Sequence, residues 1–313
     1  MAYTLDPELA AALAALPVSS APPAARGDWQ AVRKAGNAGW AAWSAAAPSY
    51  PEVNTTSYFA ETADGTPIEL RWFTKDGSSS GSAVVYAHGG GMILGNLDVY
   101  AFVIAEYVAR SGVPFLAVEY RLAPQGTGTM LAEDVFTALT WLTVHAAELG
   151  VDPDRIALMG DSGGGCPTAG AAILARDRGM PVARQILIYP MLDDQNLIPN
   201  PLLQPFATWT YDNNFTGLSA LLGERLGDAT VSPLAVPARL QNAAGLPPTY
   251  IEVGELDIFR DEDIAYAQKL ATGGVPVELH VHPGVNHGFD RLAPASRPVQ
   301  RAMSDRVRVI EAI

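Results

Sequence analysis

The chain of 313 residues is acidic, with a formal net charge of −13 and an isoelectric point near 4.7. Hydrophobic residues make up 49% of the sequence and charged residues 17%, a balance typical of a folded globular protein. The negative charge excludes nucleic acid and anionic membrane surfaces as expected partners, because both repel an acidic protein. The length suits one α/β domain of about 250–300 residues with a small accessory region.

The single cysteine is Cys166, so the sequence predicts neither an intrachain disulfide nor a cysteine-based zinc site. The N-terminal residues carry no basic region of the kind that begins a secretory signal. The apolar run at residues 9–16 is too short to span a bilayer. We therefore expect a soluble, cytoplasmic protein without stable membrane insertion.

The first 50 residues are rich in alanine and proline. Asp28 is placed to cap a helix, and that helix would run through Trp29, Val32, Trp40 and Trp43. A single packed face does not account for these tryptophans. The segment is compatible both with ordinary core packing and with a lid over a pocket, and the sequence does not separate the two.

Strand and helix patterns alternate through most of the remaining chain. Apolar runs predict strands at residues 57–61, 67–73, 83–87, 114–119, 156–159, 185–189, 248–253 and 277–282. A hairpin turn at Asp64-Gly65 joins the first two strands, and residues 77–82 form a polar turn. Helical patterns cover residues 98–110, 131–149, a stretch that ends near residue 178, residues 262–272 and a terminal stretch from about residue 298. This alternation predicts an α/β fold with a parallel sheet and helices on both faces.

Residues 193–226 interrupt the alternation and are expected to be an insertion. They contain three prolines and four aromatic residues, Phe206, Trp209, Tyr211 and Phe215. Together with the apolar stretch that begins at Met92, these aromatics indicate an apolar substrate pocket. We predict that it is lined by Met92, Phe206, Trp209 and Tyr211, although packing inside a small subdomain accounts for the same aromatics equally well.

A strand, a tight turn and an alanine-rich helix follow one another around Ser162. The turn reads Gly-Asp-Ser-Gly-Gly over residues 160–164, which matches the Gly-x-Ser-x-Gly pattern of a nucleophile elbow. In such an elbow the serine hydroxyl stands clear of the sheet, and the following helix N-terminus favours negative charge. A glycine-rich loop that contains a serine by chance is the alternative.

A serine hydroxyl needs donors for the oxyanion, and a strand that runs directly into His88 and three glycines supplies candidates. Backbone N–H groups in residues 89–91 can point into a cavity, since no Cβ atoms stand in the way. With the N–H group of Gly163 they would form an oxyanion hole. A plain glycine turn is the alternative, and His88 is expected to fix this loop by hydrogen bonds.

Five histidines are available as the general base. His145 falls within a predicted helix, and His280 and His282 share one face of a predicted strand, where they could bind a metal. No third ligand is evident beside that pair, so we expect no metal site. His287 lies in a loop just past the last strand and is the best-placed base.

The carboxylate that orients the base should lie between the serine and the histidine in the chain. Asp257 follows the predicted strand at residues 248–253 and meets this condition. Asp261 and Glu255 are the alternatives. Asp261, Glu262 and Asp263 are better explained as negative charge at the start of the next helix.

Five motifs together resemble the hormone-sensitive-lipase-like branch of the α/β-hydrolases. They are His-Gly-Gly-Gly at residues 88–91, Tyr-Arg-Leu-Ala-Pro at 120–124, Gly-Asp-Ser-Gly-Gly-Gly at 160–165, Gly-Glu-Leu-Asp at 254–257 with Arg-Asp-Glu at 260–262, and His-Gly-Phe at 287–289. The resemblance covers roughly residues 50–295. It implies an α/β-hydrolase fold with an eight-stranded, mostly parallel sheet and a helical cap.

The resemblance also implies roles for individual residues. Ser162 would be the nucleophile, His287 the base and Asp257 its orienter. The oxyanion donors would be Gly90, Gly91 and Gly163. Residues 1–50 and 193–226 would form the cap, and residues 51–192 and 227–313 the catalytic domain. The implied protein is a cofactor-free carboxylesterase that acts on short- to medium-chain acyl esters and could form a homodimer.

The sequence departs from the family pattern at four places. Gly163 replaces an alanine, which should leave its N–H group usable. Cys166-Pro167 follows the elbow, so the first helical turn should be irregular or start late, and Cys166 is expected to be a small buried residue. Residues 125–129 replace a more rigid loop, and Met92 replaces a bulky aromatic residue beside the pocket.

Other functions remain compatible with parts of this pattern. An amidase, lactonase or formamidase would use the same three residues. A small-molecule receptor on this fold would keep the glycines and the serine but lose the histidine, which His287 argues against. A pure interaction domain would not require the glycine loop and the elbow together.

Overall fold

The computed structural model describes residues 3–16, 22–77 and 81–313. Residues 1–2 and 17–21 of the predicted cap region lie outside this part of the chain, as do residues 78–80 of the predicted polar turn. Among the helices of the described residues, none combines the length and the hydrophobicity that a membrane span requires.

An eight-stranded sheet forms the centre of the molecule, with the strand order β1-β2-β4-β3-β5-β6-β7-β8. The strands are β1 (Val53–Glu61), β2 (Pro67–Lys75), β3 (Ala83–Ala87), β4 (Phe115–Val118), β5 (Ile156–Asp161), β6 (Arg184–Ile188), β7 (Thr249–Gly254) and β8 (Val277–His282). Strands β3 to β8 pair in parallel, while β2 is antiparallel to both β1 and β4. The predicted fold class, a mostly parallel eight-stranded sheet, is confirmed.

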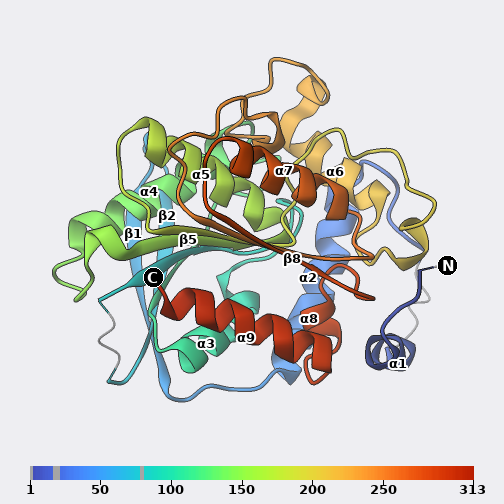
Figure 1. Ribbon diagram of the computed structural model, residues 1–313, viewed down its shortest axis with the longest axis horizontal. Helices are drawn as coiled ribbons and strands as arrows, with labels where there is room; N and C mark the ends of the chain where they lie inside the picture. Colours follow the sequence, from blue (N-terminus) through green and yellow to red (C-terminus); the bar gives the residue numbers. More distant parts are fainter. Residues whose placement is uncertain (1–2, 17–21, 78–80) are drawn as a thin grey trace.

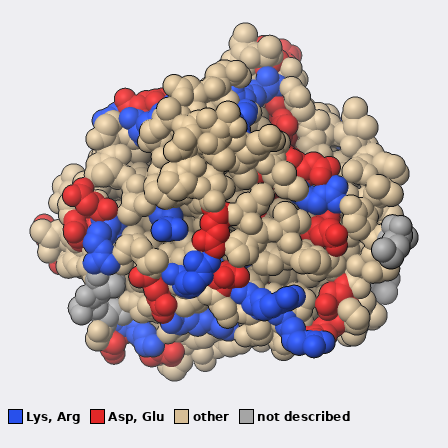
Figure 2. Space-filling model, in the orientation of Figure 1, with Lys and Arg blue, Asp and Glu red and all other residues tan. Residues whose placement is uncertain are grey.

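Helices cover both faces of the sheet (Figure 1). They are α1 (Pro7–Ala15), α2 (Trp29–Ala46), α3 (Leu97–Ser111), α4 (Met130–His145), α5 (Gly165–Asp177), α6 (Tyr211–Leu222), α7 (Arg260–Thr272), α8 (Phe289–Leu292) and α9 (Arg297–Glu311). Helices α3 and α9 lie on one face, and α4, α5 and α7 lie on the other. On the visible face, basic and acidic side chains are interspersed (Figure 2).

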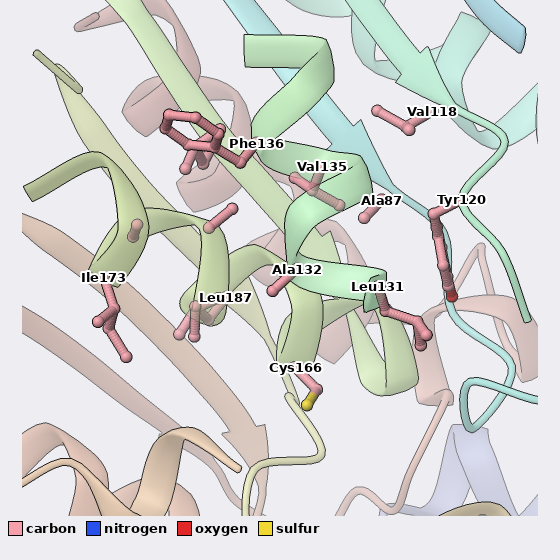
Figure 3. Packing of buried hydrophobic residues seen from close by; sticks show 14 of the residues in the cluster. Ala87, Val118, Tyr120, Leu131, Ala132, Val135, Phe136, Cys166, Ile173 and Leu187 are labelled. Carbon is pink, nitrogen blue, oxygen red and sulfur yellow. The ribbon is translucent and has the colours of Figure 1, made fainter. Parts of the chain in front are cut away.

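The hydrophobic core is divided by the sheet into two clusters. The cluster on the α4–α5 side contains Leu131, Val135 and Ile173 (Figure 3). Cys166 lies in the same cluster, where it is 3% exposed and its thiol donates to the carbonyl oxygen of Ala235 at 3.2 Å. Burial raises the pKa of this thiol, so Cys166 behaves as the small buried residue that the sequence predicted.

Two predicted boundaries differ from the structure for identifiable reasons. Strand β1 begins at Val53 rather than residue 57, because it forms one edge of the sheet and its first residues are polar and exposed. Such a strand lacks the apolar alternation that reveals a half-buried one. Helix α4 ends at His145 rather than residue 149, and the following turn closes with a hydrogen bond from the N–H of Val151 to the carbonyl of Ala146.

The insertion at residues 193–226 contains no strand among the described residues and carries α6. It packs against α2, which Asp28 caps as predicted by accepting a hydrogen bond from the N–H of Ala31. Just before α2, the N–H of Gly27 donates to the Thr216 hydroxyl of α6 at 2.9 Å. Helix α1 lies apart from this pair, and Asp6 at its start donates its N–H to the carbonyl of Gly284 at 2.7 Å.

Candidate active site

Ser162 sits at the tip of a sharp corner between β5 and α5. Its φ angle is +52°, a left-handed conformation that is uncommon for a residue with a side chain and that often marks a functional site. Residues Ser162–Gly164 form a 3₁₀ turn before the α-helix starts at Gly165. This irregular first turn agrees with the expectation from Pro167, which has no N–H group to donate.

Three side chains from separate loops form a continuous hydrogen-bonded chain. The Ser162 hydroxyl donates to Nε2 of His287 at 2.8 Å, and Nδ1 of His287 donates to Oδ2 of Asp257 at 2.7 Å. The other carboxylate oxygen of Asp257 accepts the N–H of Phe259 at 3.0 Å. Since Asp257 is only 1% exposed, its charge is directed at the imidazole rather than at water.

The imidazole of His287 is held between two aromatic rings. Tyr189 and Phe259 approach it edge-on, with ring centroids 4.8 and 5.0 Å away. The loop backbone is also tied to the insertion, because the Thr208 hydroxyl donates to the carbonyl of His287 at 2.6 Å and the Asn286 amide donates to the carbonyl of Phe206 at 2.8 Å. The base loop is therefore fixed before any substrate arrives.

The predicted oxyanion loop lies directly against the elbow. Gly90 and Gly91 have φ angles of +118° and +56°, which favour glycine. A Cβ atom on Gly163 would lie 2.4 Å from the backbone nitrogen of Gly91 and 2.5 Å from that of Met92. The alanine that the family pattern expects at residue 163 therefore does not fit this loop, and glycine is required for the close approach.

The insertion closes over the same loop from above. A Cβ atom on Gly91 would lie 2.1 Å from the Trp209 ring, so the indole rests on the glycine backbone. A Cβ atom on Gly217 in α6 would lie 2.5 Å from the carbonyl oxygen of Gly91. The insertion thus contacts the backbone of residues 90–91 directly, and the glycine at residue 91 leaves the room that the Trp209 ring occupies.

A partly open cavity of about 190 Å³ lies beside Ser162. The described residues that line it are Trp40, Gly90, Tyr100, Ser162, Tyr189, Thr208, Trp209, His287, Gly288, Arg291 and Leu292. It is slightly larger than a cavity of 150 Å³ that holds benzene. Four of these residues are Trp or Tyr, and Trp40 from α2 and Trp209 from the insertion both line the cavity.

Of the four predicted pocket residues, Trp209 is the one that the structure brings to this cavity. Met92 is fully buried in the core and has a φ angle of +64°. Tyr211 begins α6 and is 4% exposed within the same core cluster. Phe206 lies in a short 3₁₀ turn and contributes its carbonyl to Asn286.

Sequence reasoning missed Tyr100, Tyr189 and Arg291 as cavity-lining residues. Tyr189 directly follows β6, where a polar aromatic residue at a strand end could have been noticed. Tyr100 lies in α3 and Arg291 in α8, and neither belongs to a motif that carries chemistry. Trp40 was noted for its unexplained position in α2, and the cavity now accounts for it.

His88 has a structural place in the oxyanion loop. Its Nδ1 donates to the carbonyl of Gly89 at 2.7 Å, and its own carbonyl accepts the Tyr120 hydroxyl at 2.7 Å. Burial lowers the pKa of His88 to about 4, so the ring is neutral at pH 7. Residues 125–129 are held as well, since the Gln125 side chain accepts from Arg33 at 3.0 Å and the N–H of Gly128 donates to the carbonyl of Leu221.

Asp261, Glu262 and Asp263 lie in the first turn of α7, as the sequence predicted. Glu262 and Asp263 are buried there, however, and burial raises the pKa of each well above its usual range, which weakens their role as helix-start charges. The Glu262 carboxyl accepts the N–H of Leu192 and the Asn196 amide, each at 2.7 Å. Glu262 therefore anchors the start of the insertion to α7.

Two carboxylates that the sequence reasoning did not place there lie beside His280, although this group does not include His282. Glu278 and Asp305 lie 2.8 and 3.7 Å from the two ring nitrogens of His280, in an arrangement that could hold a cation. The Arg308 guanidinium contacts both carboxylates. It already supplies the positive charge that a metal ion would bring.

Comparison with known proteins places this geometry in a family. A family described as having the α/β-hydrolase fold matches residues 84–291. The chain is 34% identical to esterase LipI of Mycobacterium tuberculosis, covering 77% of each chain, and 33% identical to ethyl acetate hydrolase of Pseudomonas putida, covering 80% of each. Among solved structures, a bacterial heroin esterase is 36% identical with a TM-score of 0.90, covering 99% of this chain and 98% of the other.

The chain belongs to the α/β-hydrolases, in the hormone-sensitive-lipase-like family. Esterase LipW of Mycobacterium marinum, at 32% identity and a TM-score of 0.82, covers 98% of this chain and 95% of its own. Within the family, the chain is a carboxylic ester hydrolase, similar to curated esterases over most of its length.

Proposed function

We propose that this carboxylesterase uses Ser162 as its nucleophile, His287 as the general base and Asp257 as the residue that orients the base. The observation that supports these roles is the unbroken chain of hydrogen bonds of 2.8 and 2.7 Å from the serine hydroxyl to the carboxylate. A serine hydroxyl is unreactive at neutral pH unless a neighbouring base takes its proton.

In the proposed reaction Ser162 attacks the ester carbonyl carbon and His287 accepts the hydroxyl proton. The N–H groups of Gly90, Gly91 and Gly163 stabilise the oxyanion of the tetrahedral intermediate. His287 then gives its proton to the departing alcohol, which leaves an acyl group on the serine. Water, activated by the same imidazole, attacks the acyl carbonyl and releases the acid.

We also propose that the substrates are short- to medium-chain acyl esters and that activity falls for longer chains. The cavity of about 190 Å³ supports this limit, because it holds little more than a benzene-sized group. The cap would consist of residues 1–50 and 193–226. The contacts of α2 with α6, and the presence of Trp40 and Trp209 at one cavity, support the grouping of these two segments.

Replacement of the nucleophile tests the proposal directly. Ser162→Ala should abolish hydrolysis of p-nitrophenyl butanoate while the thermal unfolding curve stays that of a folded protein. Ser304→Ala is the control: Ser304 lies on α9, its hydroxyl donates only to the carbonyl of Gln300 among the described residues, and it does not line the described part of the cavity, so the variant should retain full activity. Steady turnover by Ser162→Ala would show that another residue is the nucleophile.

A series of p-nitrophenyl esters from two to sixteen acyl carbons measures the chain-length limit in the unmodified enzyme. We expect kcat/KM to peak among the short members. A parallel series of p-nitroanilides distinguishes an esterase from an amidase, since amides need more help from the acid that protonates the leaving group. Faster anilide than ester cleavage would contradict the proposed reaction.

A further inference from the structure

One permanently charged side chain stands among the aromatic and small residues that line the described part of the cavity. Arg291 in α8 shares the cavity with Ser162 and with the aromatic residues Trp40, Tyr100 and Tyr189. A guanidinium remains protonated at any pH at which the protein is folded. The cavity described as an apolar acyl site therefore contains a cation.

Arg291 is held in place from several sides. Its Nη2 is bonded to the carboxylate of Asp161, and its Nη1 donates to the Tyr100 hydroxyl. The guanidinium carbon also lies 4.6 Å from the centre of the Tyr100 ring. Since Asp161 directly precedes Ser162, and also accepts the Tyr86 hydroxyl at 2.6 Å, the cation is fixed close to the nucleophile.

The guanidinium has donors left over. It carries five N–H groups, of which these two hydrogen bonds use one on each Nη atom; Nε is buried without an acceptor among the described residues, so the second N–H of each Nη atom is left for a ligand. The Arg291 side chain is 17% exposed, whereas the Asp161 side chain is 2% exposed. A molecule in the cavity therefore meets the donors of the ion pair and not its acceptor.

We propose, building on the esterase function given above, that Arg291 binds a second oxygen acceptor of the substrate. The preferred substrates are then small esters that carry a second carbonyl or carboxylate group near the ester that is cleaved. A neutral carbonyl suffices, because Asp161 already balances the charge of Arg291. The spare N–H groups make a hydrogen bond to that oxygen, which a purely alkyl ester cannot accept.

Pairs of esters with the same shape test this preference in the unmodified enzyme. In the first pair, ethyl 4-oxopentanoate carries the second carbonyl on its acyl part, and ethyl 4-methylpentanoate has a methyl group in place of that oxygen. In the second pair, the acetate of 2-oxopropanol carries the second carbonyl on its alcohol part, and the acetate of 2-methylpropanol lacks it. We expect about a tenfold higher kcat/KM for the oxo ester in at least one pair, because hydrogen bonds to charged groups are strong. Equal values within twofold in both pairs would overturn the proposal.

The kcat/KM of monoethyl succinate, compared with that of ethyl 4-oxopentanoate, shows whether an ionised carboxylate is a better second acceptor than a neutral carbonyl. Arg291→Gln should reduce the oxo-to-methyl ratio to about one, and Arg291→Lys should keep part of the preference for the succinate ester. The ratio is the readout, since both esters of a pair share any general loss of activity. Arg308→Gln, which removes an exposed arginine from α9, should leave the ratio unchanged.

Binding to Ser162→Ala, measured by calorimetry, separates this inference from the proposed reaction. Tighter binding of ethyl 4-oxopentanoate than of ethyl 4-methylpentanoate supports the role of Arg291, even if the esterase roles are wrong. If Arg291→Gln does not fold, this binding measurement takes the place of the kinetic comparison. Equal binding of the two esters, together with a kcat/KM ratio that Arg291→Gln leaves unaltered, would contradict the role of Arg291.

Discussion

The residues at the strand ends are held differently from the residues of α2 and the insertion, which lie over the site. Ser162, Asp257 and His287 lie on loops that leave β5, β7 and β8, and these strands are buried or paired within one continuous ladder. Trp40 and Trp209 come from segments that form no strand, and these segments reach the site through side-chain packing and a few hydrogen bonds such as that from Thr208 to the carbonyl of His287. The sheet thus fixes these three side chains, whereas α2 and the insertion, together called the cover below, shape the space beside them.

The largest expected effect lies at the strand ends. Asp257→Asn should lower kcat by about 10⁴, because an amide at this position favours the wrong tautomer of His287 and does not stabilise its charged form. The chain-length preference should stay the same, since Asp257 does not line the described part of the cavity. Both quantities come from kinetics with the p-nitrophenyl ester series.

Asp261→Asn is the matched control, because Asp261 lies four residues away and pairs at the surface with Arg260. It should retain nearly full activity. A large loss in Asp261→Asn with little loss in Asp257→Asn would reverse the assignment of the orienting carboxylate.

A smaller effect is expected where the two regions meet. Gly91→Ala should lower kcat about a hundredfold, because the new methyl group would displace the oxyanion loop from the Trp209 ring. The double variant Gly91→Ala/Trp209→Ala should have a kcat about tenfold higher than Gly91→Ala alone, because removal of the indole makes room for the methyl group. Absence of any recovery would mean that the cover does not constrain the loop.

Gly179→Ala provides the backbone control for this pair. Gly179 has a φ angle of +67°, similar to that of Gly91, but no atom lies within 4 Å of an added Cβ among the described residues. The substitution should cost about 1 kcal/mol of stability and leave kcat unchanged. Any further loss in Gly91→Ala is then due to its neighbours.

The smallest effect concerns the stability of the sheet region and its dependence on pH. Burial raises the pKa of Glu119, just after β4, to about 7, against an ordinary value of 4.5. Its carboxyl therefore stabilises the fold fully below pH 4.5, and that contribution is lost as the pH rises through 7. Glu119→Gln still accepts the N–H of Leu97 and should be about 2 kcal/mol more stable than the parent at pH 8.

Urea unfolding at pH 5 and pH 8 measures this difference, which should be much smaller at pH 5. Glu148→Gln, at an exposed position, should behave alike at the two pH values. The ester preference of Glu119→Gln should equal that of the parent, because Glu119 does not line the described cavity. A change in chain-length preference would show that the sheet and the cover are more tightly coupled than their contacts suggest.

The sequence predicts well which three side chains meet, because each of them follows a strand within a short motif. Ser162, Asp257 and His287 are separated by long stretches of chain, but parallel strands end at the same edge of a sheet. Their meeting therefore follows from the order of strands and loops. Helices and strands of the sheet region were located within a few residues for the same reason, except at the exposed edge, where β1 lacks apolar alternation.

The cavity walls could not be predicted in this way, because they depend on how helices without sequence motifs pack. Met92 is an example: it follows the glycine loop, yet its positive φ angle leaves its side chain in the core. Arg291 is the opposite case, since a charged residue in a four-residue helix carries no sign that it faces a cavity. The sequence places Glu262 and Asp263 at a helix start but does not reveal that they are buried, because burial of Glu262 depends on the neighbouring insertion.

The direct backbone contact among Gly91, Gly163 and Gly217 limits how this enzyme can be re-engineered. Exchange of the whole 193–226 segment with that of a relative would require a glycine at the same helical position, or the donor loop would be pushed off the elbow. Libraries that vary Trp40 and Leu292, while residues 206–217 are kept, should therefore yield more active variants than cap exchange.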